Sequence, residues 1–185
     1  HYKVDWTAVK DKISKKTKMI VINTPQNPSG TLFSKEDMIQ LQLITTNTDI
    51  VVLSDEVYEH IVFDGEQHQS ACLFPDLKSR TLVTASFGKT FHNTGWKMGY
   101  CCGPKDLMDE FQKVHQFNVF SVSHPVQIAL AEYLKEPLHY QELSGFYQQK
   151  RDLFLDLIKD SRFNYVPSQG TYFQSLNYTS ITDEL

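Results

Sequence analysis

Side chains capable of chemistry follow three short apolar runs of the sequence. The first run is followed by Asn23–Gly30, the second by Ser54–Tyr58 and the third by Ser86–Lys89. Together these segments offer amides, hydroxyls, carboxylates, a phenol and an amine. A desolvated lysine amine beside an acid is a good nucleophile towards carbonyl groups, which is the basis of Schiff-base chemistry. The residue types therefore indicate carbonyl or amine chemistry centred on Lys89.

A single residue excludes one rival interpretation of Lys89. Gly88-Lys89-Thr90 has the ending of the nucleotide-binding loop G-x-x-x-x-G-K-[ST], which requires a glycine at position 83. That position is occupied by Val83. The pattern therefore does not predict a nucleotide site.

The apolar runs themselves predict the strands that position these segments. Residues 19–22, 50–53 and 81–85 are rich in β-branched side chains and lack polar alternation, which is typical of strands buried on both faces of a parallel sheet. Residues 98–102 form a fourth candidate strand. Ligands bind beyond the carboxyl ends of parallel strands, so the three polar segments are expected to converge on one site. We predict an α/β fold with a mostly parallel sheet sandwiched by helices.

A helix is predicted between the first two strands. Ser34 and Asp37 form a start signal, because a serine can cap a helix whose third residue is acidic. Apolar side chains then recur near helical spacing at Met38, Leu41 and Ile44. Strand, helix and strand in this order indicate a βαβ crossover.

The second half of the chain is predicted to be mostly helical. One helix begins after Pro104 and another at Pro125. A long helix is predicted over residues 137–160, with Gly145 as a bend. At 1.5 Å per residue it would measure about 36 Å, enough to link two domains. A strand over Gly170–Leu176 is predicted to follow.

Composition excludes several classes of function. The chain has 185 residues, 41% hydrophobic and 22% charged, and a formal net charge of −4. No excess of positive charge is present to neutralise phosphates, so no nucleic-acid partner is expected. The apolar runs fall far short of the roughly 18 residues of a membrane span, so no membrane partner is expected. The cysteines and histidines lack metal-ligand spacing, which predicts no metal site and favours a cytoplasmic location.

Three motifs together carry a family resemblance. They are Pro25-Gln-Asn27-Pro-Ser-Gly30, then Asp55-Glu-Val-Tyr58, then Ser86-Phe-Gly-Lys89 continuing to Tyr100. In this order, and over almost the whole chain, they resemble the fold-type-I, pyridoxal-phosphate-dependent aminotransferases of class I/II. The sequence from Ser86 to Lys97 is most similar to that of the branch that acts on methionine, glutamine and kynurenine.

The resemblance implies the catalytic roles. Lys89 would hold pyridoxal 5′-phosphate as a Schiff base and move a proton between the substrate and the cofactor. Asp55 would pair with the pyridine nitrogen and keep it protonated, which makes the ring an electron sink. Tyr58 would act beside them. On the residues alone, Asp55 also fits an ordinary helix cap and Tyr58 a core aromatic.

The resemblance also implies the remaining cofactor contacts. Asn27 and Tyr58 would hydrogen-bond the 3′ oxygen of the cofactor, and Ser86 and Lys97 would bind its phosphate. Lys97 stands where many family members have arginine, so it would offer a point charge instead of a bidentate fork. Without the resemblance, Asn27-Pro28 fits a plain turn.

The family pattern implies a domain division and an incomplete chain. Residues 1–160 would be part of the large cofactor-binding domain, with 137–160 as its linking helix, and residues 161–185 would begin a small C-terminal domain. The chain starts at His1 and stops at Leu185 as if it were an internal fragment. The arginine that binds the substrate α-carboxylate would lie outside it.

The expected function is transamination from an L-amino acid to a 2-oxo acid by a homodimer. Methionine, glutamine or an aromatic amino acid would be the donor. Two alternatives stay open: a pyridoxal-phosphate-dependent C–S β-lyase, and a catalytically incomplete fragment that acts only in binding or dimerisation.

Overall fold

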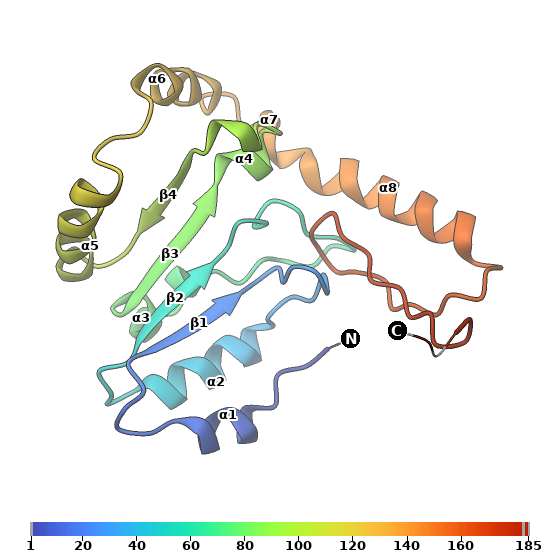
Figure 1. Cartoon of the computed structure of the whole chain (residues 1–185), viewed down its shortest axis with the longest axis horizontal. Helices are drawn as coiled ribbons and strands as arrows, with labels where there is room; N and C mark the ends of the chain where they lie inside the picture. Colours follow the sequence, from blue (N-terminus) through green and yellow to red (C-terminus); the bar gives the residue numbers. More distant parts are fainter. Residues whose placement is uncertain (1, 183, 185) are drawn as a thin grey trace.

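A four-stranded sheet forms the centre of the chain. The computed structural model describes residues 2–182 and 184. Its strands are β1 (Met19–Asn23), β2 (Val51–Asp55), β3 (Thr81–Ser86) and β4 (Gly99–Cys102), in the spatial order β1-β2-β3-β4. The first three run parallel and β4 runs antiparallel to β3 (Figure 1). The four predicted strands and the mostly parallel sheet are confirmed.

The predicted crossover helix is α2 (Lys35–Thr45). Its capping box is complete, because the Ser34 hydroxyl accepts a bond from the Asp37 N–H and the Asp37 carboxylate accepts one from the Ser34 N–H. The same carboxylate accepts a bond from Trp6 Nε1 at 2.8 Å, which ties α1 (Trp6–Lys12) to the start of α2. The apolar face of α2 is buried.

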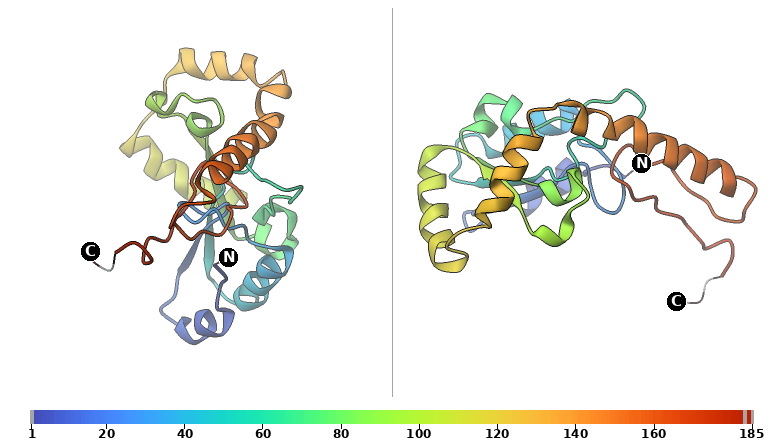
Figure 2. Two further views of the ribbon diagram at one scale, coloured as in Figure 1. Left: turned by 90° about the vertical axis from the view of Figure 1, so that its right-hand side faces the viewer. Right: turned by 90° about the horizontal axis from the view of Figure 1, so that it is seen from above.

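The main core lies on one face of the sheet. There α2 packs beside a 3₁₀ turn, η1 (Ala71–Leu73), and α3 (Pro75–Lys78), on the same side of the strands in the left view of Figure 2. The core residues are Ile22, Met38, Leu41, Ile44, Val52, Ala71, Phe74, Leu77 and Val83.

The prediction that the strands are buried on both faces is wrong for β1 in the described chain. The side chains of Met19 and Val21 are 49% and 63% exposed. The side chain of Ile22, which points to the opposite face, is 7% exposed. The reason is that α2 and α3 cover the same face, so successive β1 residues alternate between core and surface.

Helices α5 (Lys105–Asn118) and α6 (His124–Tyr133) follow β4, and both confirm sequence predictions. No side chain of α5 is buried in the described chain, and Phe117 is 88% exposed. Between β3 and β4 lie two short elements that the sequence did not predict, α4 (Phe87–Thr90) and a 3₁₀ turn, η2 (Thr94–Trp96).

The single long helix predicted over residues 137–160 is wrong. The structure has α7 (Leu138–Gln141) and α8 (Leu143–Ile158), separated at Glu142, and Gly145 lies within α8. Tertiary packing gives the reason, because Leu143 is buried against the loop that follows β2. The 16 residues of α8 span about 24 Å beyond the carboxyl ends of the parallel strands (Figure 1).

The strand predicted over Gly170–Leu176 is also wrong. The segment forms only the isolated bridge Val62–Gly170, and a second isolated bridge, Asn164–Asn177, lies just outside it. The carbonyl of Gly30, a residue with φ of +67°, accepts the N–H groups of Gln169 and Gly170, so these donors are used by a loop. The start of a small domain at residue 161 stays a prediction.

None of the helices in the described residues combines the length and the apolar character that crossing a membrane requires.

Candidate active site

A cavity of about 470 Å³ lies at the carboxyl ends of β1, β2 and β3. The strand register explains this, because Asn23 pairs with Asp55 and Asp55 pairs with Thr84 across the three strand ends. The cavity is lined by Asn23, Asn27, Asp55, Val57, Tyr58, Thr84, Ala85, Ser86, Lys89 and Phe173. Five of the six predicted site residues are therefore brought to one cavity.

A larger hollow of about 740 Å³ is lined by parts of residues 2–4 and 26–37. Its carboxylate, Asp37, already accepts bonds from Trp6 and from Ser34 at the start of α2. The smaller cavity is the stronger candidate, because it places an amine, a carboxylate and a phenol together.

Asn23 organises the loop after β1. Its Oδ1 accepts the N–H of Asn27 at 2.8 Å, and its Nδ2 donates to the carbonyl of Asp55 at 3.0 Å. It therefore joins the loop that carries Asn27 to the end of β2. The sequence analysis gave Asn23 no role, and its place at the end of an apolar run was the available signal.

Asp55 and Tyr58 reach the cavity from the end of β2. The carboxylate of Asp55 accepts the N–H of Val57 at 3.2 Å, which leaves it further acceptor positions. The Tyr58 side chain is buried, with its ring edge-on to Tyr172 at 5.2 Å between centroids. Burial, followed by interaction with Tyr172 and the charge of Asp55, raises the pKa of Tyr58. The phenol therefore stays protonated near neutral pH and can donate a hydrogen bond.

Ser86 and Lys89 reach the cavity from the end of β3. The Ser86 hydroxyl accepts the N–H of Gly88 at 3.2 Å and donates to the Met98 carbonyl at 3.4 Å. Lys89 lies in the following turn, α4, and is half-buried. No carboxylate of residues 2–182 and 184 forms an ion pair with its amine, so the amine is available to a ligand.

Lys89 also lines a second cavity of about 360 Å³. The other residues around it are Gly88, His92, Thr94, Tyr147 and Tyr172. The Tyr147 hydroxyl lies 3.3 Å from His92 Nδ1, which links α8 to the loop after α4. The lysine amine is thus shared by a polar cavity and an aromatic one.

Lys97 is the predicted site residue that the structure does not place in the cavity. It is exposed and ends η2 with a left-handed φ of 54°. Its predicted phosphate contact therefore rests on the sequence motif.

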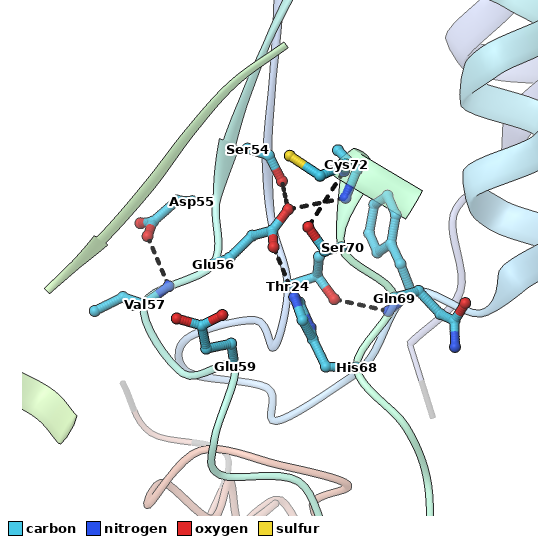
Figure 3. A network of polar contacts seen from close by, with 12 residues as sticks. Thr24, Ser54, Asp55, Glu56, Val57, Glu59, His68, Gln69, Ser70 and Cys72 are labelled. Carbon is cyan, nitrogen blue, oxygen red and sulfur yellow. Dashed lines mark hydrogen bonds and ion pairs between the residues drawn. The ribbon is translucent and has the colours of Figure 1, made fainter. Parts of the chain in front are cut away.

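A buried carboxylate lies directly behind Asp55. The side chains of Asp55 and Glu56 leave β2 on opposite sides, and that of Glu56 enters a polar network with Ser54, His68 and Ala71 (Figure 3). Burial raises the pKa of Glu56, but the hydrogen bond and charge of His68, with the bonds from Ala71 and Ser54, outweigh burial and lower its pKa overall.

The donor set of the cavity fits pyridoxal phosphate. An amine can bind the aldehyde carbon, a carboxylate can pair with the ring nitrogen, and a protonated phenol with an amide can face the ring oxygen. The hydroxyl of Ser86 can bind phosphate. All of these groups line the one cavity.

Comparison with known proteins supports the same assignment. The family model for aminotransferase class I and II matches residues 1–184. The methionine aminotransferase of Escherichia coli K12 is 43% identical over 98% of this chain and 47% of its own length. The kynurenine–oxoglutarate transaminase of Dictyostelium discoideum is 38% identical over 94% of this chain and 41% of its own length.

Solved structures give the same result for the fold. The crystal structure of YbdL from Escherichia coli, identified with a methionine aminotransferase function, has a TM-score of 0.96 at 42% identity and covers 98% of this chain. A Thermus thermophilus aspartate aminotransferase double mutant has a TM-score of 0.88 at 28% identity and covers 97%. The chain spans 48% and 47% of these two structures, about half of each. The predicted fold, part of a fold-type-I large domain, is confirmed, and the chain belongs to the aminotransferase class I and II family.

Proposed function

We propose that the whole protein is a pyridoxal-phosphate-dependent aminotransferase that moves an amino group from an L-amino acid to a 2-oxo acid. One observation carries the proposal: the amine of Lys89, the carboxylate of Asp55 and the phenol of Tyr58 line one cavity at three neighbouring strand ends. An aldehyde-bearing cofactor needs these groups, and family membership makes pyridoxal phosphate that cofactor.

Each residue has a separate task in this proposal. Bound pyridoxal phosphate supplies an electron sink for carbanion chemistry at the amino acid α-carbon. Asp55 would keep a proton on the ring nitrogen, while Asn27 and Tyr58 would donate to the ring oxygen. Lys89 would accept a proton at Nζ and return it, acting as base and then as acid.

The phosphate contacts are divided between two residues. Ser86 would donate its hydroxyl to the phosphate from within the cavity. For Lys97 the support is the motif from Ser86 to Tyr100, and its exposed position lies outside the residues that line the cavity.

Methionine or an aromatic amino acid is the proposed donor. The two sequence relatives described above are named for methionine and kynurenine. The second cavity beside Lys89 presents the rings of Tyr147 and Tyr172. Aromatic rings make favourable contacts with a thioether sulfur and with other rings, which supports donors of either kind.

The central test is chemical labelling of Lys89. The whole protein is treated with pyridoxal phosphate, reduced with borohydride, digested and mapped by mass spectrometry. The label is expected on Lys89 and is expected to be absent in Lys89→Ala. Lys105→Ala is the matched control, because Lys105 is an exposed lysine on α5 paired with Asp109. A label on another lysine, or no label, would contradict the proposal.

Product analysis separates the two cofactor chemistries. With methionine and a 2-oxo acid, the proposal expects a new amino acid and the 2-oxo acid derived from methionine. Release of a thiol, ammonia and pyruvate from a cysteine conjugate, without amino transfer, would favour the C–S β-lyase instead.

We propose in addition that the enzyme is a homodimer, which the family resemblance supports, and that it is cytoplasmic, which its free cysteines support. Light scattering after size-exclusion chromatography should give twice the mass of one whole chain. A monomer that retains full activity would refute the dimer.

A further inference from the structure

Two glutamates alternate with the two site residues at the end of β2. Asp55 and Tyr58 line the cavity, whereas Glu56 extends away from it. The side chain of Glu56 is almost completely buried, and Glu59 lies within bonding distance of the Tyr100 hydroxyl on β4. A carboxylate is rarely buried unless its charge is paired and hydrogen-bonded, so the surroundings of Glu56 need an explanation.

The carboxylate of Glu56 accepts three hydrogen bonds (Figure 3). Its Oε1 accepts the Ser54 hydroxyl at 2.8 Å and the Ala71 N–H at 3.0 Å. Its Oε2 accepts His68 Nε2 at 2.8 Å. Two of these donors stand 12 and 15 residues further along the chain, so the carboxylate joins the end of β2 to residues 68–71.

The histidine in this network is committed to Glu56. The His68 side chain is 11% exposed, and its Nδ1 is buried without a hydrogen-bond partner among the described residues. Because the carboxylate needs a donor, we assign the ring proton to Nε2. His68 is thereby oriented by Glu56, since its other nitrogen has no bond to hold the ring.

The cavity side of the same segment is tied to the neighbouring strands through its backbone. The Asp55 carbonyl accepts the Thr24 N–H at 3.1 Å and Asn23 Nδ2 at 3.0 Å. The Glu56 N–H donates to the Thr84 carbonyl at 2.9 Å, the last bond that ties this strand end to β3. Beyond it, Val57 N–H bonds to Asp55 Oδ1, and Glu59 N–H bonds to the Glu56 carbonyl at 2.9 Å. In the described part of the chain, the hydrogen bonds that join residues 55–59 to residues 68–71 all end on the Glu56 side chain.

We propose that Glu56 is a positioning residue of the active site, which bridges the end of β2 to residues 68–71 and thereby holds Asp55 and Tyr58 in place in the cavity. This inference rests on the proposed function, because Asp55 and Tyr58 matter here as cofactor ligands. Glu56 itself touches neither cofactor nor substrate.

Two substitutions separate position from charge. Glu56→Gln keeps an oxygen for Ser54 and Ala71, and its amide can donate to the ring of His68 if the ring proton moves to Nδ1. Glu56→Ala removes the whole bridge. Glu66→Ala is the matched control, because Glu66 is an exposed glutamate of the same loop.

Three quantities are measured on the whole protein. They are its affinity for pyridoxal phosphate, kcat at saturating cofactor, and the pH midpoint of the bound cofactor's absorbance change. In Glu56→Ala we expect a loss of about 10- to 100-fold in affinity or kcat, by analogy with residues that orient metal ligands from behind. The pH midpoint should shift as well, because it reports the contacts that Asp55 and Tyr58 make. Glu56→Gln should stay within about threefold of the wild type, and Glu66→Ala should not change.

Three outcomes would overturn the inference. One is a Glu56→Ala protein that is less stable but, once folded, keeps the wild-type kcat and pH midpoint, because Glu56 would then be merely structural. Another is a Glu56→Gln protein as impaired as Glu56→Ala, because charge and not position would then be responsible. The third is a Glu56→Ala protein without any change.

A second variant and a second measurement keep the test decisive. If Glu56→Ala does not fold, His68→Leu removes the Oε2 donor alone and is expected to shift the midpoint away from the wild-type value; an unshifted midpoint would refute the inference. If the wild type fails to take up cofactor at Lys89, the proposed function fails separately. Amide hydrogen exchange of the cofactor-free protein then tests whether Glu56 holds residues 55–58 in place. Faster exchange at these residues in Glu56→Ala supports this role, and unchanged exchange refutes it.

Discussion

The proposed chemistry depends on a few side chains at the carboxyl ends of the strands and on the residues that surround them. Lys89 is half-buried and lines two cavities, while Tyr58 is held protonated by burial beside Tyr172. Glu56, in contrast, is buried yet ionised, because His68, Ala71 and Ser54 donate hydrogen bonds to its carboxylate. Residue types alone indicated Lys89, Asp55 and Tyr58, but the raised pKa of Tyr58 depends on what packs against it.

The lowered pKa of Glu56 predicts how stability depends on pH. A carboxyl whose pKa is lower in the folded state than in the unfolded chain adds stability above its ordinary pKa, here 4.5, and loses it as pH falls through the folded value. The free energy of unfolding should therefore decrease as the pH is lowered below about 5. Urea denaturation at a series of pH values measures this.

Glu56→Gln is the variant that assigns this effect. Its free energy of unfolding should fall less steeply with decreasing pH than that of the wild type. The pKa of Asp64 is also lowered, because the hydrogen bond from Arg151 outweighs the opposing effect of burial. Asp64→Asn therefore serves as the comparison. Parallel pH curves for Glu56→Gln and the wild type would show that Glu56 is not the group responsible.

At the scale of elements, local signals determined where most strands and helices begin. The capping box of Ser34 and Asp37 starts α2, and the apolar face that follows is buried. Strands β1, β2 and β3 coincide with the β-branched runs. Elements that end through tertiary contacts were predicted less well: the break at Glu142 follows from the burial of Leu143, which no local pattern indicates.

The N-cap of α2 gives a quantitative prediction. Ser34→Ala removes the side-chain acceptor of the Asp37 N–H and should lower the free energy of unfolding by about 1 kcal/mol. Lys35→Ala, at an exposed neighbouring position, should change it by no more than about 0.5 kcal/mol. Chemical denaturation monitored by circular dichroism measures both. Equal effects of the two substitutions would contradict a specific role for the cap.

At the scale of the whole molecule, one arginine joins three distant segments. Arg151 on α8 makes two bonds to the carboxylate of Asp64, at 2.6 and 2.7 Å, and one to the Ser168 carbonyl at 2.7 Å. Its guanidinium lies 4.8 Å from the centroid of the Phe63 ring. The arginine side chain is 8% exposed and that of Asp64 is 52% exposed. The bonds to Asp64 therefore lie at the surface, whereas the bond to the Ser168 carbonyl is partly buried. Arg151 thus fixes α8 against the loop after β2 and the segment after residue 160.

Removing this arginine should loosen α8 without affecting the sheet. A charge-assisted hydrogen bond contributes about 1.5–3 kcal/mol, so Arg151→Met should speed amide exchange in α8 and residues 168–171 by about tenfold or more. Exchange in α2 should not change. Lys150→Met is the control, because Lys150 is exposed and its side chain packs on Phe146. Uniformly faster exchange throughout the protein would mean that Arg151 supports global stability instead.

The sequence by itself determined the strands, the crossover helix and the side chains that meet at the strand ends. These depend on runs of a few residues and on the rule that parallel strands bring their carboxyl ends together. The sequence therefore suffices to bring together Asn27, Asp55, Tyr58, Ser86 and Lys89, which line one cavity in the structure.

Only the tertiary structure decided which distant groups pair. Glu56 meets His68 across 12 residues and Arg151 meets Asp64 across 87, and neither pair has a local signature. The irregular path of residues 170–176 has the same origin, because the Gly30 carbonyl takes the N–H groups of Gln169 and Gly170. Local patterns encode the elements and the chemistry they carry, whereas the partners of buried charges and backbone donors depend on segments that meet only in the folded chain.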